Sequence, residues 1–150
     1  MYKFVDRPVN RLTMSGRFLL WATRAWSAAI ASGICPPQAL LGGFSSVGAV
    51  QGLRDFHLGM ALLNRDASRE IAVAPLNCPR IAEDEAVLLQ LWHNLALGDV
   101  DAMRATLGLI APDHLVPPVA RAMTAVAAQL IASGFVLDGL IQETFEEDTQ

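Results

Sequence analysis

Hydrophobic residues recur along this chain at the three- and four-residue spacing of amphipathic helices, and proline and glycine residues separate the helical stretches. The longest such stretch covers residues 10–32, where Leu12, Leu19 and Trp26 recur every seven positions. Gly33 follows, at the place where glycine commonly ends a helix. The pattern predicts a long first helix with a broad apolar face.

The following residues predict further helices. We expect a short helical turn over 37–41, ended by the glycine pair at 42 and 43, and then a long helix capped by Ser45 or Ser46 that runs to about residue 64. Three more helices are expected from about 82 to 97, from 100 to 110 and from 117 to 133, with a last amphipathic turn at 137–145. Short links favour antiparallel neighbours among the last three. The prediction is an all-α, single-domain bundle of five to six helices, with flexible ends at 1–9 and 146–150.

One segment does not follow the helical pattern. Residues 69–74 alternate in the manner of a strand but are too short for more than one extended piece, and Pro75 and Pro79 bracket the residues that follow. A lone strand has no partner within a helical chain. Residues 69–80 are therefore expected to form an extended loop, or an edge that pairs across a dimer.

The composition is more apolar than that of a typical soluble domain. Of the 150 residues, 53% are hydrophobic and 17% are charged, against about 45–50% and about 25% in typical domains. The apolar run at 18–34 contains Arg24, and the run at 122–137 is shorter than the roughly 20 residues that cross a bilayer. A membrane span is therefore not expected, whereas peripheral membrane contact stays open. We favour the interpretation that a second chain covers the surplus apolar surface.

Charge is distributed unevenly along the chain. The net charge is −4, but residues 1–25 carry a local +4 and residues 138–150 a local −5. The two ends could attract each other, within one chain or between subunits, or each could simply be solvated. The basic end is sparse and no nucleic-acid-binding motif is present, so a nucleic-acid partner is not expected.

The cysteine content bears on the compartment. Cys35 and Cys78 are too few for a disulfide framework, and no apolar leader opens the chain. We therefore expect a cytoplasmic protein with reduced thiols.

Candidate chemical groups are few. No catalytic motif, cofactor fingerprint or metal-ligand spacing occurs, so no catalytic residue, cofactor or metal is expected. Cys78 lies just before a predicted helix start and close to Arg80, two features that favour the thiolate form, although the acidic residues at 83–85 oppose them. His57 fits the edge of the core, with a ligand or proton carrier as the alternative. His93 lies on a helix flank, and these three residues are the candidates for a thiol or ligand site.

The central segment also resembles a known family. A Ser-Arg and apolar stretch at 68–74 leads into a Pro-x-x-Cys-Pro turn at 75–79 and an acidic helix start that ends in Leu88 and Leu89. This arrangement is similar to the signature of a small uncharacterised family of alphaproteobacterial helical proteins. Some members carry further cysteines in the turn, where this chain has Leu76 and Asn77. The resemblance implies a helical fold and directs attention to Cys78.

Three functional hypotheses follow from the sequence. The first is a non-enzymatic helical interaction or regulatory protein that acts as a homodimer or with another protein partner. The second is a thiol- or metal-dependent sensor or small enzyme centred on Cys78. The third is a protein that holds a small apolar ligand between its helices.

Overall fold

The first helix begins and ends at capping residues. In the computed structural model, which describes residues 3–142, α1 (Met14–Ser32) starts after Thr13, whose side-chain oxygen accepts a hydrogen bond from the Gly16 amide. It stops at Gly33, where φ is 71°, a left-handed conformation that favours glycine. The predicted start at residue 10 is wrong, because Val9–Arg11 form a separate 3₁₀ turn and the chain then runs extended up to Thr13.

The glycine pair at 42 and 43 does not end a helix. α2 (Pro36–Ser46) runs through both glycines, and α3 (Leu53–Asp66) begins only after a 3₁₀ turn at Val50–Gly52. A Cβ at Gly43 would collide with the Trp21 ring of α1, so glycine here permits α1 and α2 to approach closely. Ser45 and Ser46 therefore close α2, and the prediction that one of them caps the next helix is wrong.

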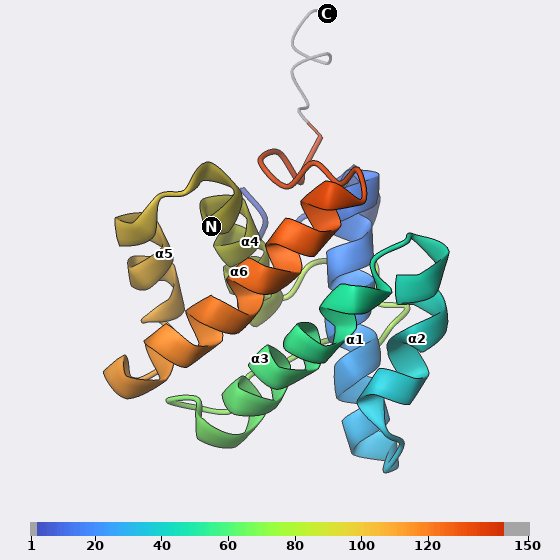
Figure 1. Ribbon diagram of the computed structural model, residues 1–150, viewed down its shortest axis with the longest axis horizontal. Helices are drawn as coiled ribbons and strands as arrows, with labels where there is room; N and C mark the ends of the chain where they lie inside the picture. Colours follow the sequence, from blue (N-terminus) through green and yellow to red (C-terminus); the bar gives the residue numbers. More distant parts are fainter. Residues whose placement is uncertain (1–2, 143–150) are drawn as a thin grey trace, which may run out of the picture.

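The second half of the chain contains three helices, α4 (Glu83–Leu97), α5 (Val100–Leu107) and α6 (Val116–Ala132), with a 3₁₀ turn at Asp113–Leu115 before the last. Gly98 ends α4 in a left-handed conformation, and the Asp99 carboxylate accepts from the Ala102 amide to cap α5. α4 and α5 form the expected hairpin, whereas α6 packs chiefly against α3 (Figure 1).

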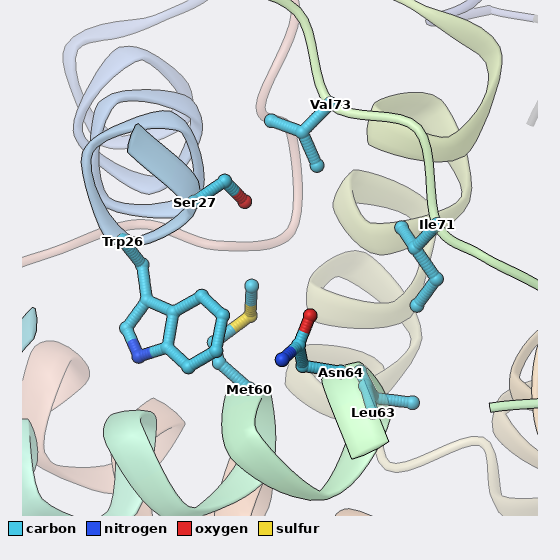
Figure 2. A pocket seen from close by; sticks show the side chains of 7 residues that line it. All are labelled: Trp26, Ser27, Met60, Leu63, Asn64, Ile71 and Val73. Atoms are coloured by element: carbon cyan, nitrogen blue, oxygen red, sulfur yellow. The ribbon is translucent and has the colours of Figure 1, made fainter. Parts of the chain in front are cut away.

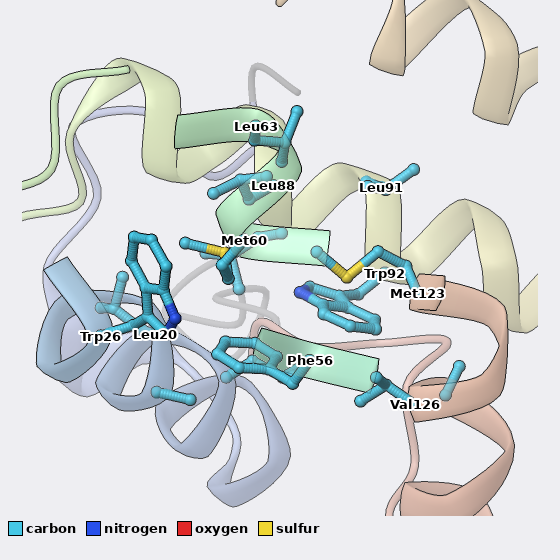
Figure 3. Packing of buried hydrophobic residues seen from close by; sticks show 14 of the residues in the cluster. Leu20, Trp26, Phe56, Met60, Leu63, Leu88, Leu91, Trp92, Met123 and Val126 are labelled. Carbon is cyan, nitrogen blue, oxygen red and sulfur yellow. The ribbon is translucent and has the colours of Figure 1, made fainter. Parts of the chain in front are cut away.

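The fold is the predicted all-α bundle. Residues 3–142 contain six α-helices and no strand, and the only ladder contacts among them are two isolated bridges. The core lies where α3 crosses the other helices. Figure 3 shows Phe56 and Met60 of α3 between Trp26 of α1 and Trp92 of α4. The Phe56 and Trp92 rings are stacked with their centroids 6.4 Å apart, and burying each such side chain contributes about 1.5–3 kcal/mol.

The amino-terminal segment packs onto the bundle. Phe4 is fully buried, the Asp6 amide donates to the Ile81 carbonyl at 2.8 Å, and the Val9 amide donates to the Pro79 carbonyl at 2.7 Å. Residues 3–9, which were expected to be a flexible end, thus carry an aromatic anchor and backbone hydrogen bonds to the bundle. The other expected flexible end, 146–150, lies outside the described residues.

The two ends of the described chain lie side by side (Figure 1). The Thr13 amide donates to the Leu140 carbonyl at 2.8 Å, and the Gln142 amide donates to the Arg11 carbonyl at 2.7 Å. Residues 137–142 are extended here, so the helical turn predicted for them is wrong. Their proximity to the basic start of the chain comes from backbone pairing, and most of the acidic residues invoked for an attraction lie outside the described range.

One stretch is long and apolar enough to cross a membrane by length and composition alone. It covers Asp113–Ala132, and 44% of its most apolar window is buried inside the bundle. Met123, Val126 and Leu130 of this stretch belong to the core. The same properties are found in core helices of globular bundles.

Candidate functional site

A buried ion pair joins the middle of α1 to the first turn of α4. The Arg24 Nε donates to Glu85 Oε2 at 2.8 Å and its Nη2 donates to Oε1 at 2.9 Å, a bidentate arrangement. Arg24 is 2% exposed and the Glu85 side chain is completely buried. Such a pair is stable only when its remaining donors and acceptors are satisfied.

Every donor of Arg24 and both carboxylate oxygens of Glu85 have such partners. Arg24 also donates from Nη1 to the Cys78 and Leu76 carbonyls, at 2.8 and 3.5 Å, and from Nη2 to the Arg80 carbonyl at 2.9 Å. Glu85 also accepts from the amides of Ala74 and Ala82, at 2.9 and 2.8 Å. The five guanidinium N–H groups and the carboxylate lone pairs are thereby used, mostly to hold residues 74–82.

A second carboxylate extends this cluster. Asp84, which is 4% exposed, accepts from Nη1 and Nη2 of Arg69 at 2.8 Å each and from the Ala72 amide at 2.7 Å. The Arg69 side chain is half exposed, at 50%. Asp84 therefore holds the start of the 69–80 segment, whereas Arg24 and Glu85 hold its remainder.

The 69–80 segment is an extended piece whose hydrogen-bond partners are charged side chains. Its even-numbered residues turn backbone groups towards the charged side chains: the amides of Ala72 and Ala74 donate to carboxylates, and the carbonyls of 76, 78 and 80 accept from Arg24. Backbone groups of alternate residues in an extended chain point the same way, which accounts for Ala72 and Ala74. A turn closed by the Cys78 amide on the Pro75 carbonyl then brings the later carbonyls to Arg24. Of the two expectations for this segment, the structure shows the loop, with partners supplied by α1 and α4 of the same chain.

The electrostatics of the cluster follow from these contacts. The hydrogen bond to Glu85 is the main cause that holds the pKa of Arg24 above its usual value, against the opposing effect of burial. The hydrogen bonds from Arg69, helped by the Ala72 amide, hold the pKa of Asp84 below its usual range. Both groups are therefore charged at neutral pH, and the cluster is a set of fixed charges.

Sequence reasoning missed this cluster. It took Arg24, with Arg17, as part of a polar stripe on the first helix, and it interpreted the acidic residues at 83–85 as the start of a helix. Arg17 is indeed exposed, but Arg24 is buried with Asp84 and Glu85. The available signal was an arginine in the middle of an apolar run, because an unpaired arginine there would be very costly.

The three candidate residues named from the sequence do not gather into one site. His57 accepts at Nδ1 a hydrogen bond from the Trp26 indole at 3.0 Å, between α3 and α1. The His93 ring is half-buried near Lys3 and Asp138, and burial is the main cause that lowers its pKa. The half-buried Cys78 thiol donates to the Arg80 carbonyl at 3.4 Å. Among residues 3–142, no group of three or more His, Cys, Asp or Glu is placed to hold a metal ion.

Cys78 lies at the edge of an open hollow of about 380 Å³. Arg17 and Asn10 also line it, together with neighbours of Cys78 in the 69–80 segment. The Cys78 thiol is close enough to Arg24 to contribute to the raised pKa of the guanidinium, after the larger effect of Glu85. This thiol is therefore the one candidate from the sequence that adjoins the charged cluster.

A second surface feature lies on the α4–α5 hairpin. Leu97, Val100 and Leu109 are 57%, 53% and 50% exposed, although all three are large and apolar. Leu109 also lines an open hollow of about 370 Å³ with the small residues Ala102 and Ala105. α5 buries only two of its own residues, so most of this helix faces solvent.

The floor of this hollow is a satisfied polar network. The buried Asn94 of α4 donates to Thr106 Oγ1 at 2.7 Å and to the Ala102 carbonyl at 3.2 Å, and it accepts from Gln90 at 3.0 Å. These bonds fix α5 on α4 and leave its apolar and small residues facing outward. The hairpin therefore presents these residues on its outer surface.

Comparison with protein-family models, with curated proteins and with solved structures finds no match for this chain.

Proposed function

We propose that this chain is a non-enzymatic helical interaction protein that forms a homodimer through the outer face of the α4–α5 hairpin. The observation that carries the proposal is the exposure of Leu97, Val100 and Leu109 on the hairpin, together with the shallow hollow that Leu109 lines with Ala102 and Ala105. Small residues allow a second helix to approach closely, and the flanking large apolar residues supply area to bury.

The charges on α5 favour a second copy as the occupant of this face. Asp101 and Arg104 are both exposed and lie about one helical turn apart, and the exposed Ala105 follows Arg104 directly. In a two-fold dimer the same patch meets itself, so antiparallel α5 helices would bring Asp101 of each copy opposite Arg104 of the other. Self-complementary charges set the register of such a contact.

Sedimentation equilibrium over a micromolar-to-millimolar range tests this proposal. The wild-type chain should sediment as a dimer, and Ala105→Arg should be monomeric because a long cation would occupy the contact. Ala128→Arg is the matched control, because Ala128 is exposed on α6, away from the hairpin. A wild-type monomer throughout the range, or equal effects of the two variants, would contradict the proposal.

We place this dimer in the cytoplasm, with a second copy as its partner. The support is that Cys35 and Cys78 are both free thiols, which reducing compartments preserve. Fractionation of cells that express the tagged chain tests the location. Recovery with the soluble cytoplasmic marker supports it, whereas recovery with secreted or membrane-embedded proteins contradicts it.

A thiol function of Cys78 is the second candidate, favoured by its position beside Arg24 and at the edge of a hollow. A nearby guanidinium stabilises a thiolate and so promotes its reactions. At neutral pH, iodoacetamide should then react with half-buried Cys78 faster than with exposed Cys35, which serves as the internal control. Slower reaction at Cys78 would remove this candidate, and elemental analysis of the purified chain tests the metal-dependent version.

A further inference from the structure

The 69–80 segment, which we call the strap, is attached to the bundle mainly by polar contacts. All of its side chains are exposed or half-buried, and none belongs to the buried core. Most of its hydrogen bonds run to Arg24, Asp84 and Glu85, and its last two residues also bond the amino-terminal segment, whereas the helices on either side are held by buried apolar residues. Segments with few buried apolar contacts are the ones that open locally while the rest of a protein stays folded.

The strap covers a small apolar hollow between α1 and α3. Figure 2 shows Ile71 and Val73 on the extended segment, across from Trp26 of α1 and Met60 and Leu63 of α3. The hollow has room of about 30 Å³, enough for one water-sized group. Ser27 and Asn64 lie at its margin (Figure 2).

The charged cluster remains paired when the strap is absent. Arg24 and Glu85 bind each other through two hydrogen bonds that do not involve the strap. If the strap lifts, water replaces its amides and carbonyls on these groups, so neither charge is left buried without a partner. Lifting also leaves the stacking of Phe56 on Trp92 intact.

We propose that the strap is a conformational device that opens as one unit over the intact six-helix bundle. Opening uncovers Trp26, Met60 and Leu63, which line the hollow beneath the strap. The ends of the moving unit are set by backbone bonds, from the Ser68 amide to the Ile110 carbonyl at 2.9 Å and from the Val9 amide to the Pro79 carbonyl at 2.7 Å.

Residue-resolved hydrogen exchange tests the opening in the wild-type chain. The amides of Ala72 and Ala74 donate only to carboxylates of the cluster, so their exchange reports on the strap. They should share one opening free energy, and it should be lower than that of the amides in the middle of α4. Exchange of the strap amides only together with those of α4, as in global unfolding, would overturn the proposal.

A pair of surface variants separates the strap from the bundle. Arg69→Ala removes two hydrogen bonds to Asp84 and should speed exchange at Ala72 by about tenfold or more, with the amides of α4 and α6 unchanged. Arg65→Ala is the control, because Arg65 is exposed and pairs only with its neighbour Asp66. Equal acceleration in strap and helices by Arg69→Ala, or no acceleration in the strap, would overturn the proposal.

Thiol labelling gives an independent readout of the same event. In a Cys35→Ser background, Cys78 is the only thiol, and it lies on the strap. Arg69→Ala should raise its rate of reaction with a bulky disulfide reagent by the same factor as it raises exchange at Ala72. A labelling rate that Arg69→Ala leaves unchanged would contradict opening of the strap as one unit.

Discussion

At the scale of single residues, the fold depends on one buried charge pair that the apolar pattern conceals. Arg24 occupies the middle of an otherwise apolar helix and reaches Glu85 together with three carbonyls of the 69–80 segment. Apolar side chains in these places could fill the volume, but they could not provide partners for the backbone of the segment. The pair is therefore what gives an extended, strand-like piece a place in a helical bundle.

Removing one charge of this pair should be strongly destabilising. Glu85→Gln keeps the volume but leaves Arg24 buried without its counter-charge, so the free energy of unfolding should fall by about 3–5 kcal/mol. Glu83→Gln is the matched control, because Glu83 is exposed in the same helical turn and should change stability by less than about 0.5 kcal/mol. Urea unfolding measures both, and similar losses in the two variants would show that the buried pair does not stabilise the fold.

The lowered pKa values of two side chains predict that the free energy of unfolding falls as the pH is lowered. Burial, with Lys3 nearby, lowers the pKa of His93, and Arg69 lowers that of Asp84. Each group binds protons more readily in the unfolded chain, so stability falls as the pH drops below the unfolded value, near 6.5 for His93 and 3.8 for Asp84. Urea unfolding across this range should show both losses. His93→Gln should abolish the loss of stability near pH 6.5 and keep the loss near pH 3.8. If the loss near pH 6.5 persisted in His93→Gln, its assignment to His93 would be contradicted.

At the scale of elements, the sequence predicted which stretches are helical better than it predicted their ends. Apolar spacing identified five of the six helices because it reflects burial on one face, whereas α2 was expected only as a short turn. The errors occurred at Gly42 and Gly43, whose role depends on the approach of Trp21 from another helix. The same reasoning applies to 137–142, which have an amphipathic pattern but pair with the backbone before α1.

Adding a single methyl group at Gly16 should displace the 135–142 segment from the start of α1. A Cβ there would lie 2.5 Å from the Leu140 carbonyl oxygen, a backbone atom that cannot rotate away. Gly16→Ala should therefore cost about 1–3 kcal/mol and should speed exchange of the Thr13 amide, which donates to that carbonyl. Thermal denaturation and hydrogen exchange give the two readouts.

Gly42→Ala is the control for this prediction. Gly42 lies inside α2 with nothing within 4 Å of a Cβ, so alanine should stabilise the helix by about 0.5–1 kcal/mol. The two substitutions add the same atom and should have opposite signs. Stabilisation by Gly16→Ala would mean that the 135–142 segment does not pack against α1 as described.

At the scale of the whole molecule, the apolar surplus divides into a core and an exposed hairpin face. Composition predicted a surplus without locating it, because an amphipathic pattern does not show which face a neighbouring helix covers. The structure locates part of it at Leu97, Val100 and Leu109. The candidate site was less predictable: Cys78 was identified from its neighbours in sequence, whereas Arg24, its neighbour in space, required the fold.

The central claim is that two copies meet through antiparallel α5 helices, and a charge-swap series measured by sedimentation equilibrium tests it most directly. Arg104→Asp and Asp101→Arg should each weaken association, because each places like charges opposite one another across the two-fold axis. The double variant should restore association towards the wild-type value. A wild-type monomer would contradict this account. So would a double variant whose loss of association free energy equals or exceeds the sum of the losses in the two single variants.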